Sequence, residues 1–441
     1  MLHTKIFAIL ALVCINNRIV LSDYCYHDDE NPYLYYSTLT AYENEHGLIK
    51  NVTVPNCEPV QIWMLARHGT RYPTKKEIKS MKNDLPDLQE SIIKNHKKHG
   101  RGSLCSSDLR ELESWELDPS VRKSNKKYLT KQGEEDLLSL ARRFKNYFPE
   151  LLRSRPDEIL EDGYKFRSTD TQRTVLSMER FINGLFGNVT IGNTEVIPSS
   201  EDYLLTLYKN CKAWAEQSNN EDDEVDKFLN TSQFTQVVHN VSRRLGFKEN
   251  LNSDDVLLMH NACAFESAWY IGKKSPWCTA FTADELKVIE YKMDLHYYYH
   301  ASYGRNLSRA VGCPPLQNMF NHFVKLENGD SEEPRGIFYF AHSSGIQLLL
   351  TAMGIAEDAT PLKANNFENM RNRTWNTSHL VPFAANLAAI FYKCDSGNKV
   401  RFYLNEKPLD YDGCEAGVCD WEYLKKKMEF AFSCDTDFCS K

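Results

Sequence analysis

The chain has 441 residues, of which 42% are hydrophobic and 26% are charged. This composition is typical of a folded globular protein and excludes intrinsic disorder and a coiled coil. The length exceeds what one hydrophobic core usually holds, which predicts two domains or one domain with a large insertion. The formal net charge of −7 argues against a nucleic-acid partner. A polyanionic ligand would therefore require basic residues gathered in one place.

The N-terminal residues have the pattern of a secretory signal. Lys5 is followed by an apolar run over residues 6–15, and Ser22 precedes Asp23. This pattern predicts a signal peptide over residues 1–22, with a buried N-terminal helix as the alternative. No later stretch approaches the ~18 apolar residues of a membrane span, so we expect no transmembrane segment. We expect a secreted protein, or one in the lumen of the secretory pathway such as the endoplasmic reticulum, with no C-terminal retention signal.

Cysteine usage agrees with export. Twelve cysteines follow the predicted signal: Cys25, Cys57, Cys105, Cys211, Cys263, Cys278, Cys313, Cys394, Cys414, Cys419, Cys434 and Cys439. An even number in an exported chain predicts up to six disulfides, whose pairing the spacing does not define. No CxxC pair occurs, so we expect no zinc site. The sequence also contains Asn-x-Ser/Thr sequons, which agree with a secreted glycoprotein.

Three short apolar segments each lead into a polar cluster and then into a helical pattern. Residues 60–66 (VQIWMLA) are typical of a buried parallel strand, and the Thr74/Glu77 pair beyond them fits a helix capping box. The strand–cluster pairs are 60–66 with 67–74, 164–166 with 167–170, and 336–341 with 342–345. Gly187 and Gly354 are placed to end the second and third helices. In open α/β sheets, ligands bind beyond the carboxyl ends of such strands.

The middle of the chain has a different pattern. Residues 195–320 read mainly as helices, for example over residues 281–299, and they include an acidic run at 221–224 that is typical of a solvated surface. Residues 387–394 and 399–404 flank a turn and predict a hairpin at the sheet edge. We therefore predict an α/β core from residues 23–194 and 321–441, with a mainly helical insertion over 195–320.

The polar clusters carry a combination of residues suited to phosphate. The strand ends are predicted to bring together three arginines and two histidines: Arg67, Arg71, Arg167, His68 and His342. A guanidinium group matches phosphate oxygens in pairs and keeps its charge at any working pH. A neutral imidazole held among such arginines can attack phosphorus. Phosphoryl transfer depends mainly on positioning and charge stabilisation, so such a site needs no metal or other cofactor.

Longer motifs carry a resemblance to a known family. The segments are WMLARHGTRYPT (63–74), FRSTDTQRT (166–174), YFAHSS (339–344), LVPFAANLAAIFYKC (380–394) and VRFYLNEKPL (400–409). They resemble the histidine acid phosphatase and phytase branch of the histidine phosphatase superfamily, and within it the multiple inositol polyphosphate phosphatases. The resemblance covers nearly the whole chain after the predicted signal. It implies a three-layer α/β core with a central, mostly parallel sheet and a mainly helical inserted domain.

The resemblance also implies roles for individual residues. His68 would be the nucleophile that becomes phosphohistidine, and His342 would hydrogen-bond the phosphoryl group. Arg67, Arg71 and Arg167 would bind that group. Lys75 and Lys76 would either meet other phosphates of an inositol polyphosphate substrate or lie exposed in a first helical turn. The implied reaction is hydrolysis of a phosphomonoester.

The chain departs from the family at one position. At the second histidine the resembling enzymes carry His-Asp or His-Ala-Glu, whereas this chain has His342-Ser343-Ser344. Neither serine supplies a carboxyl group to protonate the departing alkoxide, a contribution commonly worth ~10²–10⁴-fold. Three alternatives follow: a slower phosphatase or one whose substrate supplies the proton, a pseudo-phosphatase that binds inositol phosphates, and an extracellular interaction protein.

Overall fold

The computed structural model describes residues 25, 34–49, 52–152, 163–189, 194–216, 221–415 and 417–440. The predicted signal peptide over residues 1–22 lies outside them. Within the described residues, no helix is both long and apolar enough to cross a membrane.

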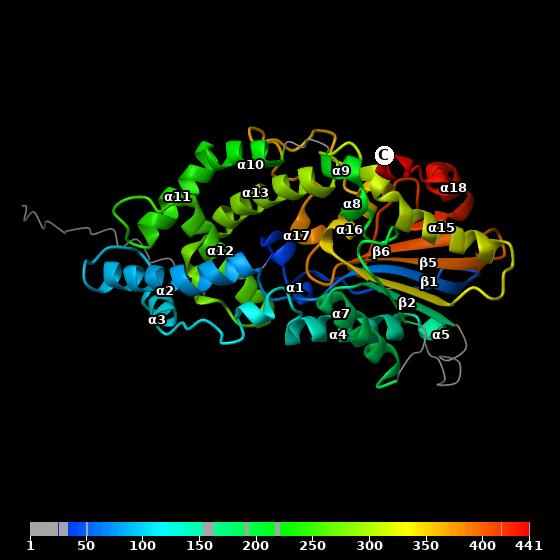
Figure 1. The fold of residues 1–441 in the computed structure, drawn as a ribbon, viewed down its shortest axis with the longest axis horizontal. Helices are drawn as coiled ribbons and strands as arrows, with labels where there is room; N and C mark the ends of the chain where they lie inside the picture. The colour runs from blue at the N-terminus through cyan, green and yellow to red at the C-terminus, as the bar shows by residue number, and fades with distance from the viewer. Residues whose placement is uncertain are drawn as a thin grey trace, which may run out of the picture.

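A mixed sheet forms the centre of the α/β part (Figure 1). Its strands follow the order β3-β2-β4-β1-β5-β6-β7, and β8 pairs with β6. Strands β3, β2, β4 and β1 are parallel, whereas β5 pairs antiparallel with β1 and with β6. The strands are β1 (Cys57–Arg67), β2 (Tyr164–Thr169), β3 (Thr194–Ile197), β4 (Gly336–Ala341), β5 (Asn386–Cys394), β6 (Lys399–Leu404), β7 (Lys407–Pro408) and β8 (Val418–Asp420). The predicted α/β class is confirmed.

The register of the parallel strands brings the polar clusters together. Arg67, the last residue of β1, lies opposite Ala341, the last residue of β4. His68 and His342 therefore leave adjacent strands at the same edge of the sheet. Strand β2 pairs with the other side of β4, with Ser168 opposite Phe340. The sequence pattern had ended this strand at Phe166, but β2 continues to Thr169, so Arg167 lies inside the strand.

A helix begins shortly after each of these three strands. They are α2 (Lys75–Lys97), α7 (Gln172–Phe186) and α16 (Ser343–Met353). The predicted capping box is present, since Thr74 and Glu77 exchange side-chain and backbone hydrogen bonds. Gly187 ends α7 with φ of 78°, and Gly354 ends α16 with φ of 76°, a left-handed conformation that glycine adopts without steric cost. The predicted order of strand, polar cluster and helix is confirmed.

Helices cover both faces of the sheet (Figure 1). Strand β1 alternates its side chains, so that Met64 packs with α4 (Lys131–Tyr147) and α7 in one core, whereas Trp63 belongs to the core on the opposite face. The short helix α5 (Pro149–Leu152) lies on the α4 side. The opposite face is covered by α15 (Cys313–Glu327), α16 and α18 (Trp421–Lys427).

A group of helices extends from one end of the sheet (Figure 1). It contains α10 (Glu221–Leu229), α11 (Ser232–Arg244), α12 (Ser253–Trp269) and α13 (Ala283–Ala301), which agrees with the helical pattern expected for this part of the chain. Helix α2 and α3 (Ser106–Glu113) pack with this group, although they precede residue 195. Residues 195–320 also include most of strand β3 and the start of α15. The division of the chain at residues 195 and 320 stays a proposal.

Short elements and disulfides complete the fold. The remaining helices are α1 (Tyr42–Glu45), α8 (Leu207–Asn210), α9 (Lys212–Glu216), α14 (Ser308–Val311) and α17 (Thr377–Leu380), with 3₁₀ turns at Ser37–Leu39, Lys123–Asn125, Pro276–Ala280, Glu429–Ser433 and Asp437–Ser440. The six predicted disulfides are present as Cys25–Cys105, Cys57–Cys394, Cys211–Cys439, Cys263–Cys278, Cys313–Cys434 and Cys414–Cys419. The predicted hairpin is β5–β6, but β6 also pairs with β7 and β8 and is not the edge strand.

Candidate active site

The loop after β1 is held by the N-terminal end of α4. Gly69 and Gly133 pack backbone against backbone, and a Cβ atom on Gly69 would lie 2.3 Å from the Gly133 carbonyl oxygen. Asp136 accepts hydrogen bonds from the Thr70 backbone N–H at 2.8 Å and from its hydroxyl at 2.7 Å. Burial raises the pKa of Asp136 to about 6. These contacts fix the backbone on which His68 and Arg71 stand.

His68 is buried with one ring nitrogen held by the backbone. The Nδ1 atom of its ring lies 2.8 Å from the carbonyl oxygen of Gly69. A carbonyl can only accept, so Nδ1 carries the hydrogen and Nε2 keeps its lone pair. Burial and the nearby guanidinium groups of Arg67 and Arg173 lower the pKa of His68 well below 6.5. The imidazole is therefore neutral and nucleophilic at physiological pH.

His342 lies beside His68, with the two ring centroids 5.7 Å apart. Its Nδ1 accepts a hydrogen bond from the Arg173 guanidinium at 3.2 Å, because arginine can only donate. Its Nε2–H then donates to the Thr169 hydroxyl at 3.2 Å. Burial, followed by the charges of Arg173 and Lys209, lowers the pKa of His342 well below 6.5. The juxtaposition of the two histidines is the one expected from the strand ends.

Two of the predicted arginines stand next to the histidines. Arg67 is 2% exposed and donates from Nη1 to the carbonyl oxygens of Thr38 and Val381, each at 2.7 Å. Burial lowers its pKa to about 9, so the guanidinium stays charged at neutral pH. Arg71 donates to the Tyr72 carbonyl, and its guanidinium lies 5.6 Å from the ring centroid of Phe265. In the described part of the chain, neither arginine forms a salt bridge with a carboxylate.

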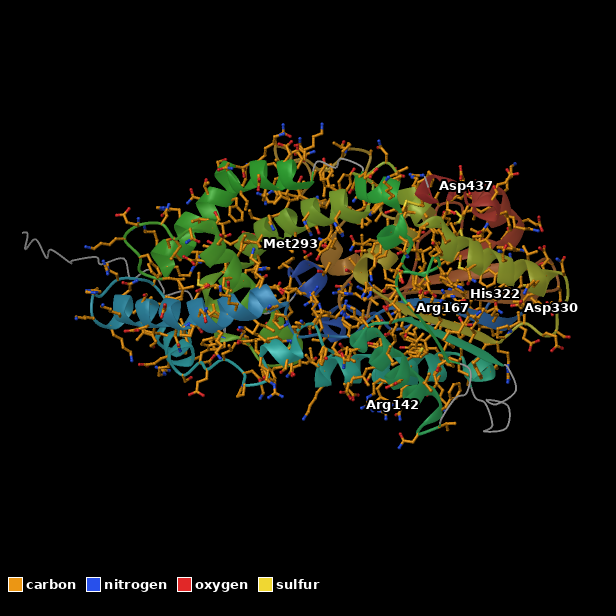
Figure 2. All side chains as sticks on the ribbon, in the orientation of Figure 1. Arg142, Arg167, Met293, His322, Asp330 and Asp437 are labelled. Atoms are coloured by element: carbon orange, nitrogen blue, oxygen red, sulfur yellow. A yellow bond between two sulfur atoms is a disulfide. The ribbon has the colours of Figure 1, made fainter. Side chains whose placement is uncertain are left out.

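Arg167 and Arg173 lie six positions apart in the chain and have different surroundings. Arg167 (labelled in Figure 2) lies in β2 and pairs with Asp202 at 2.5 Å and with Glu195 at 3.5 Å. Arg173 lies in the first turn of α7 and contacts His342. Burial and the charge of Arg71 lower the pKa of Arg173 to about 10. Sequence reasoning missed Arg173; its position in the helix that follows the FRSTD segment was the available signal.

The remaining predicted residues lie around this group. Ser343 and Ser344 form the first two positions of α16 and are half-buried. The N-terminus of a helix favours an anion, because its first backbone N–H groups point outwards without intrahelical partners. Lys75 and Lys76 are exposed in the first turn of α2. Their contact with a substrate stays a prediction.

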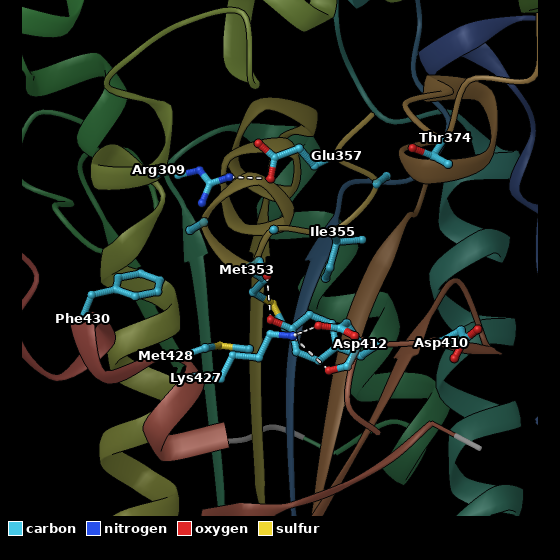
Figure 3. A pocket seen from close by; sticks show the side chains of 14 residues that line it. Arg309, Met353, Ile355, Glu357, Thr374, Asp410, Asp412, Lys427, Met428 and Phe430 are labelled. Carbon is cyan, nitrogen blue, oxygen red and sulfur yellow. Dashed lines mark hydrogen bonds and ion pairs between the residues drawn. The ribbon is translucent and has the colours of Figure 1, made fainter. Parts of the chain in front are cut away.

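A pocket elsewhere in the molecule contains cationic side chains that are paired with carboxylates. Arg309, Glu357, Asp412, Lys427 and other side chains line a cavity of about 480 Å³ beyond the C-terminal end of α16 (Figure 3). Arg309 pairs with Glu357 at 2.5 Å, and Lys427 pairs with Asp412 at 2.7 Å. By contrast, Arg67, Arg71 and Arg173 lie near one another with no carboxylate partner among the described residues. Such uncompensated positive charge favours a bound anion.

Known proteins resemble this chain over most of its length. A family model described as the histidine phosphatase superfamily (branch 2) matches residues 60–405. The chain therefore belongs to the histidine phosphatase superfamily, branch 2. It is 34% identical to multiple inositol polyphosphate phosphatase 1 of Drosophila melanogaster, over 93% of this chain and 88% of that protein. It is 28% identical to the human protein of the same name, over 91% and 88%.

Solved structures share the fold at low sequence identity. A phytase from D. castellii superposes with a TM-score of 0.76 and 19% identity, covering 93% of this chain and 88% of the phytase. The multiple inositol polyphosphate phosphatase of Bifidobacterium longum, in complex with inositol hexasulfate, superposes with a TM-score of 0.65 and 14% identity, covering 92% and 99%.

Proposed function

We propose that this protein is a phosphomonoesterase that acts on inositol polyphosphates through a phosphohistidine at His68. The observation that carries the proposal is the group of uncompensated cations around a neutral, nucleophilic imidazole. The relatives support the substrate class, since two of them are named as multiple inositol polyphosphate phosphatases. A substrate with several phosphates also suits a site rich in positive charge.

The proposed reaction has two steps. The Nε2 lone pair of His68 forms a bond to phosphorus while the ester P–O bond breaks, and the electron pair leaves on the alkoxide oxygen. Arg67, Arg71 and Arg173 stabilise the charge on the phosphoryl oxygens, and we place Arg173 rather than Arg167 in this role because Arg167 is paired with Asp202. Water then attacks phosphorus, the N–P bond breaks and phosphate leaves.

The test is phosphate release from inositol hexakisphosphate, scanned over pH, by the wild type and His68→Ala. We expect release by the wild type, an acid-labile phosphoenzyme that can be trapped during turnover, and the loss of both in His68→Ala. Equal turnover by His68→Ala would overturn the assignment of the nucleophile.

A second candidate function is binding of inositol phosphates without turnover. Ser343 and Ser344 favour it, because neither position supplies an acidic group for the leaving oxygen. Calorimetry with inositol hexasulfate and with inositol hexakisphosphate distinguishes the two functions. Binding of both ligands without phosphate release from the second would identify a binding protein.

A further inference from the structure

The site contains a nucleophile and an anion-binding group, but no carboxyl group follows His342. An alkoxide is a poor leaving group, and its departure is faster when an acid protonates the oxygen as the P–O bond breaks. Ser343 and Ser344 occupy the start of α16, and a serine hydroxyl is too weak an acid for this role. A donor would therefore have to come from another element near His342.

Lys209 lies outside the motifs, exposed on α8, and its charge acts on His342. Its ammonium group donates to the Ser199 hydroxyl at 3.3 Å, and this hydroxyl donates to the Asp170 carboxylate at 2.5 Å. Asp170 directly follows Thr169, whose hydroxyl accepts from His342 Nε2. The hydrogen-bonded chain runs from Lys209 to Asp170, the sequence neighbour of Thr169. The positive charge of Lys209 is one of the causes that lower the pKa of His342.

The segment that carries Lys209 is held in place from three sides. Cys211, which lies two residues after Lys209, forms a disulfide with Cys439. The Asn210 amide donates to the Ser199 carbonyl at 2.6 Å. Asp202, which pairs with Arg167, also accepts the backbone N–H of Leu205 at 3.0 Å. Arg167 therefore positions the turn that leads to Lys209, which gives the strand arginine a role without contact to substrate.

The surroundings of Lys209 suit an acid. The charged groups that face it are Arg173, Asp170, Asp202 and Lys127, and its ammonium lies 5.9 Å from the ring centroid of Tyr208. Partial desolvation and the charge of Arg173 lower the pKa of Lys209, which makes its ammonium a better proton donor than that of an ordinary lysine. Asp170 is not the donor, because its hydrogen bond to Ser199 lowers its pKa and keeps it ionised.

We propose that Lys209 protonates the departing alkoxide oxygen and replaces the carboxylic acid that is absent after His342. In the first step, the Lys209 ammonium gives its proton to the leaving oxygen and becomes a neutral amine. In the second step, the amine takes a proton from the water that attacks phosphohistidine and is again an ammonium. This inference rests on the proposed function, and the test below separates the two.

The test compares leaving groups. p-Nitrophenyl phosphate releases a stable phenolate and needs little protonation, whereas β-glycerophosphate releases an alkoxide and has no neighbouring phosphate to supply a proton. In Lys209→Met we expect turnover of β-glycerophosphate to fall by ~10²–10⁴-fold, the general-acid contribution, while turnover of p-nitrophenyl phosphate falls by less than about threefold. Lys212→Met is the matched control, since Lys212 is an exposed lysine on the adjacent helix paired with Glu216.

Lys209→Arg separates proton donation from charge. Arginine keeps the positive charge but does not give up its proton, so we expect it to be as slow as Lys209→Met on β-glycerophosphate. Restored turnover in Lys209→Arg, or an equal loss on both substrates, would show that Lys209 only binds anions and would overturn the proposal. The wild type could hydrolyse p-nitrophenyl phosphate through His68 but not β-glycerophosphate. This result would overturn the assignment of Lys209 as proton donor and support His68 as the nucleophile. A wild type inactive on both substrates would overturn both.

Discussion

Arg67 and Arg373 are both buried, yet their electrostatic surroundings are opposite. Arg373 donates to Asp294 at 2.6 Å and to Glu290 at 2.8 Å, and these carboxylates raise its pKa despite burial. Arg67 donates to two backbone carbonyls and lies 4.6 Å from the ring centroid of Phe383, with no salt bridge to a carboxylate among the described residues, and burial lowers its pKa to about 9. The first arrangement joins α13 to the segment before α17 by paired charges. The second leaves a positive charge that a bound anion would compensate, which is typical of a binding site.

The most severe change to the site is removal of the nucleophile. His68→Ala deletes the Nε2 atom that would form the N–P bond, so we expect turnover to fall by at least about 10⁴-fold. The measurement is steady-state hydrolysis of p-nitrophenyl phosphate, whose leaving group needs no donor. His239→Ala is the control, because His239 is exposed on α11 and hydrogen-bonds Asn250. A loss in the control of similar size would point to damage unrelated to the site.

The two buried arginines should respond differently to the same substitution. Arg67→Met removes charge from the site, and we expect kcat/KM to fall by ~10²–10³-fold. The loss of its two hydrogen bonds to carbonyls should lower stability, but by less than in Arg373→Met. Arg373→Met leaves Glu290 and Asp294 buried without their cation, and we expect a loss of about 3–5 kcal/mol of stability. Urea unfolding and kinetics of both variants provide the measurement. Equal destabilisation by the two substitutions would contradict the contrast between a binding arginine and a structural one.

A carboxyl group placed after His342 should restore part of the turnover rate that is lost when Lys209 is removed. In the Lys209→Met background, we expect Ser344→Glu to raise turnover of β-glycerophosphate by about tenfold, within the ~10²–10⁴-fold bound of general acid catalysis. Turnover of p-nitrophenyl phosphate should change little. Ser344→Gln has a similar shape without an acid and is the control. A gain of the same size with glutamine would show that the effect is not proton donation.

The charge of Arg173 should influence the pH below which kcat/KM falls. Arg173 lowers the pKa of both His68 and His342, so in Arg173→Met we expect the acid limb of kcat/KM for p-nitrophenyl phosphate to move to higher pH. Arg309→Met removes a paired surface charge and should leave the limb in place. An unchanged or lower limb in Arg173→Met would contradict the assigned electrostatics.

The same shifts predict how stability depends on pH. Because the folded pKa values of the two histidines lie below 6.5, the unfolded chain binds more protons than the folded protein in acid. Their contribution to stability is therefore complete above about pH 6.5 and is lost as the pH falls from 6.5 through the folded pKa values. Arg173→Met should make this loss shallower. Thermal unfolding between pH 8 and 5 measures the difference between the two proteins.

Local sequence patterns determined much of the fold and part of the site. The apolar runs that end in polar clusters located β1, β2 and β4, because a buried parallel strand is apolar on both faces. Thr74 with Glu77 and the glycines after α7 and α16 located helix ends by backbone chemistry alone. The even number of cysteines gave the number of disulfides, and His68 and His342 followed from the strand ends on which they stand.

Only the tertiary structure decided which side chains face one another. Strand β2 continues three residues beyond its predicted end, so Arg167 lies inside the strand and pairs with Asp202, whereas Arg173 in the first turn of α7 contacts His342. Cys434 pairs with Cys313 rather than with its sequence neighbour Cys439. The charge of Lys209 acts on His342, although more than a hundred residues separate them in the chain. Such contacts arise from long-range packing, which leaves no periodic signal in the sequence around any one of these residues.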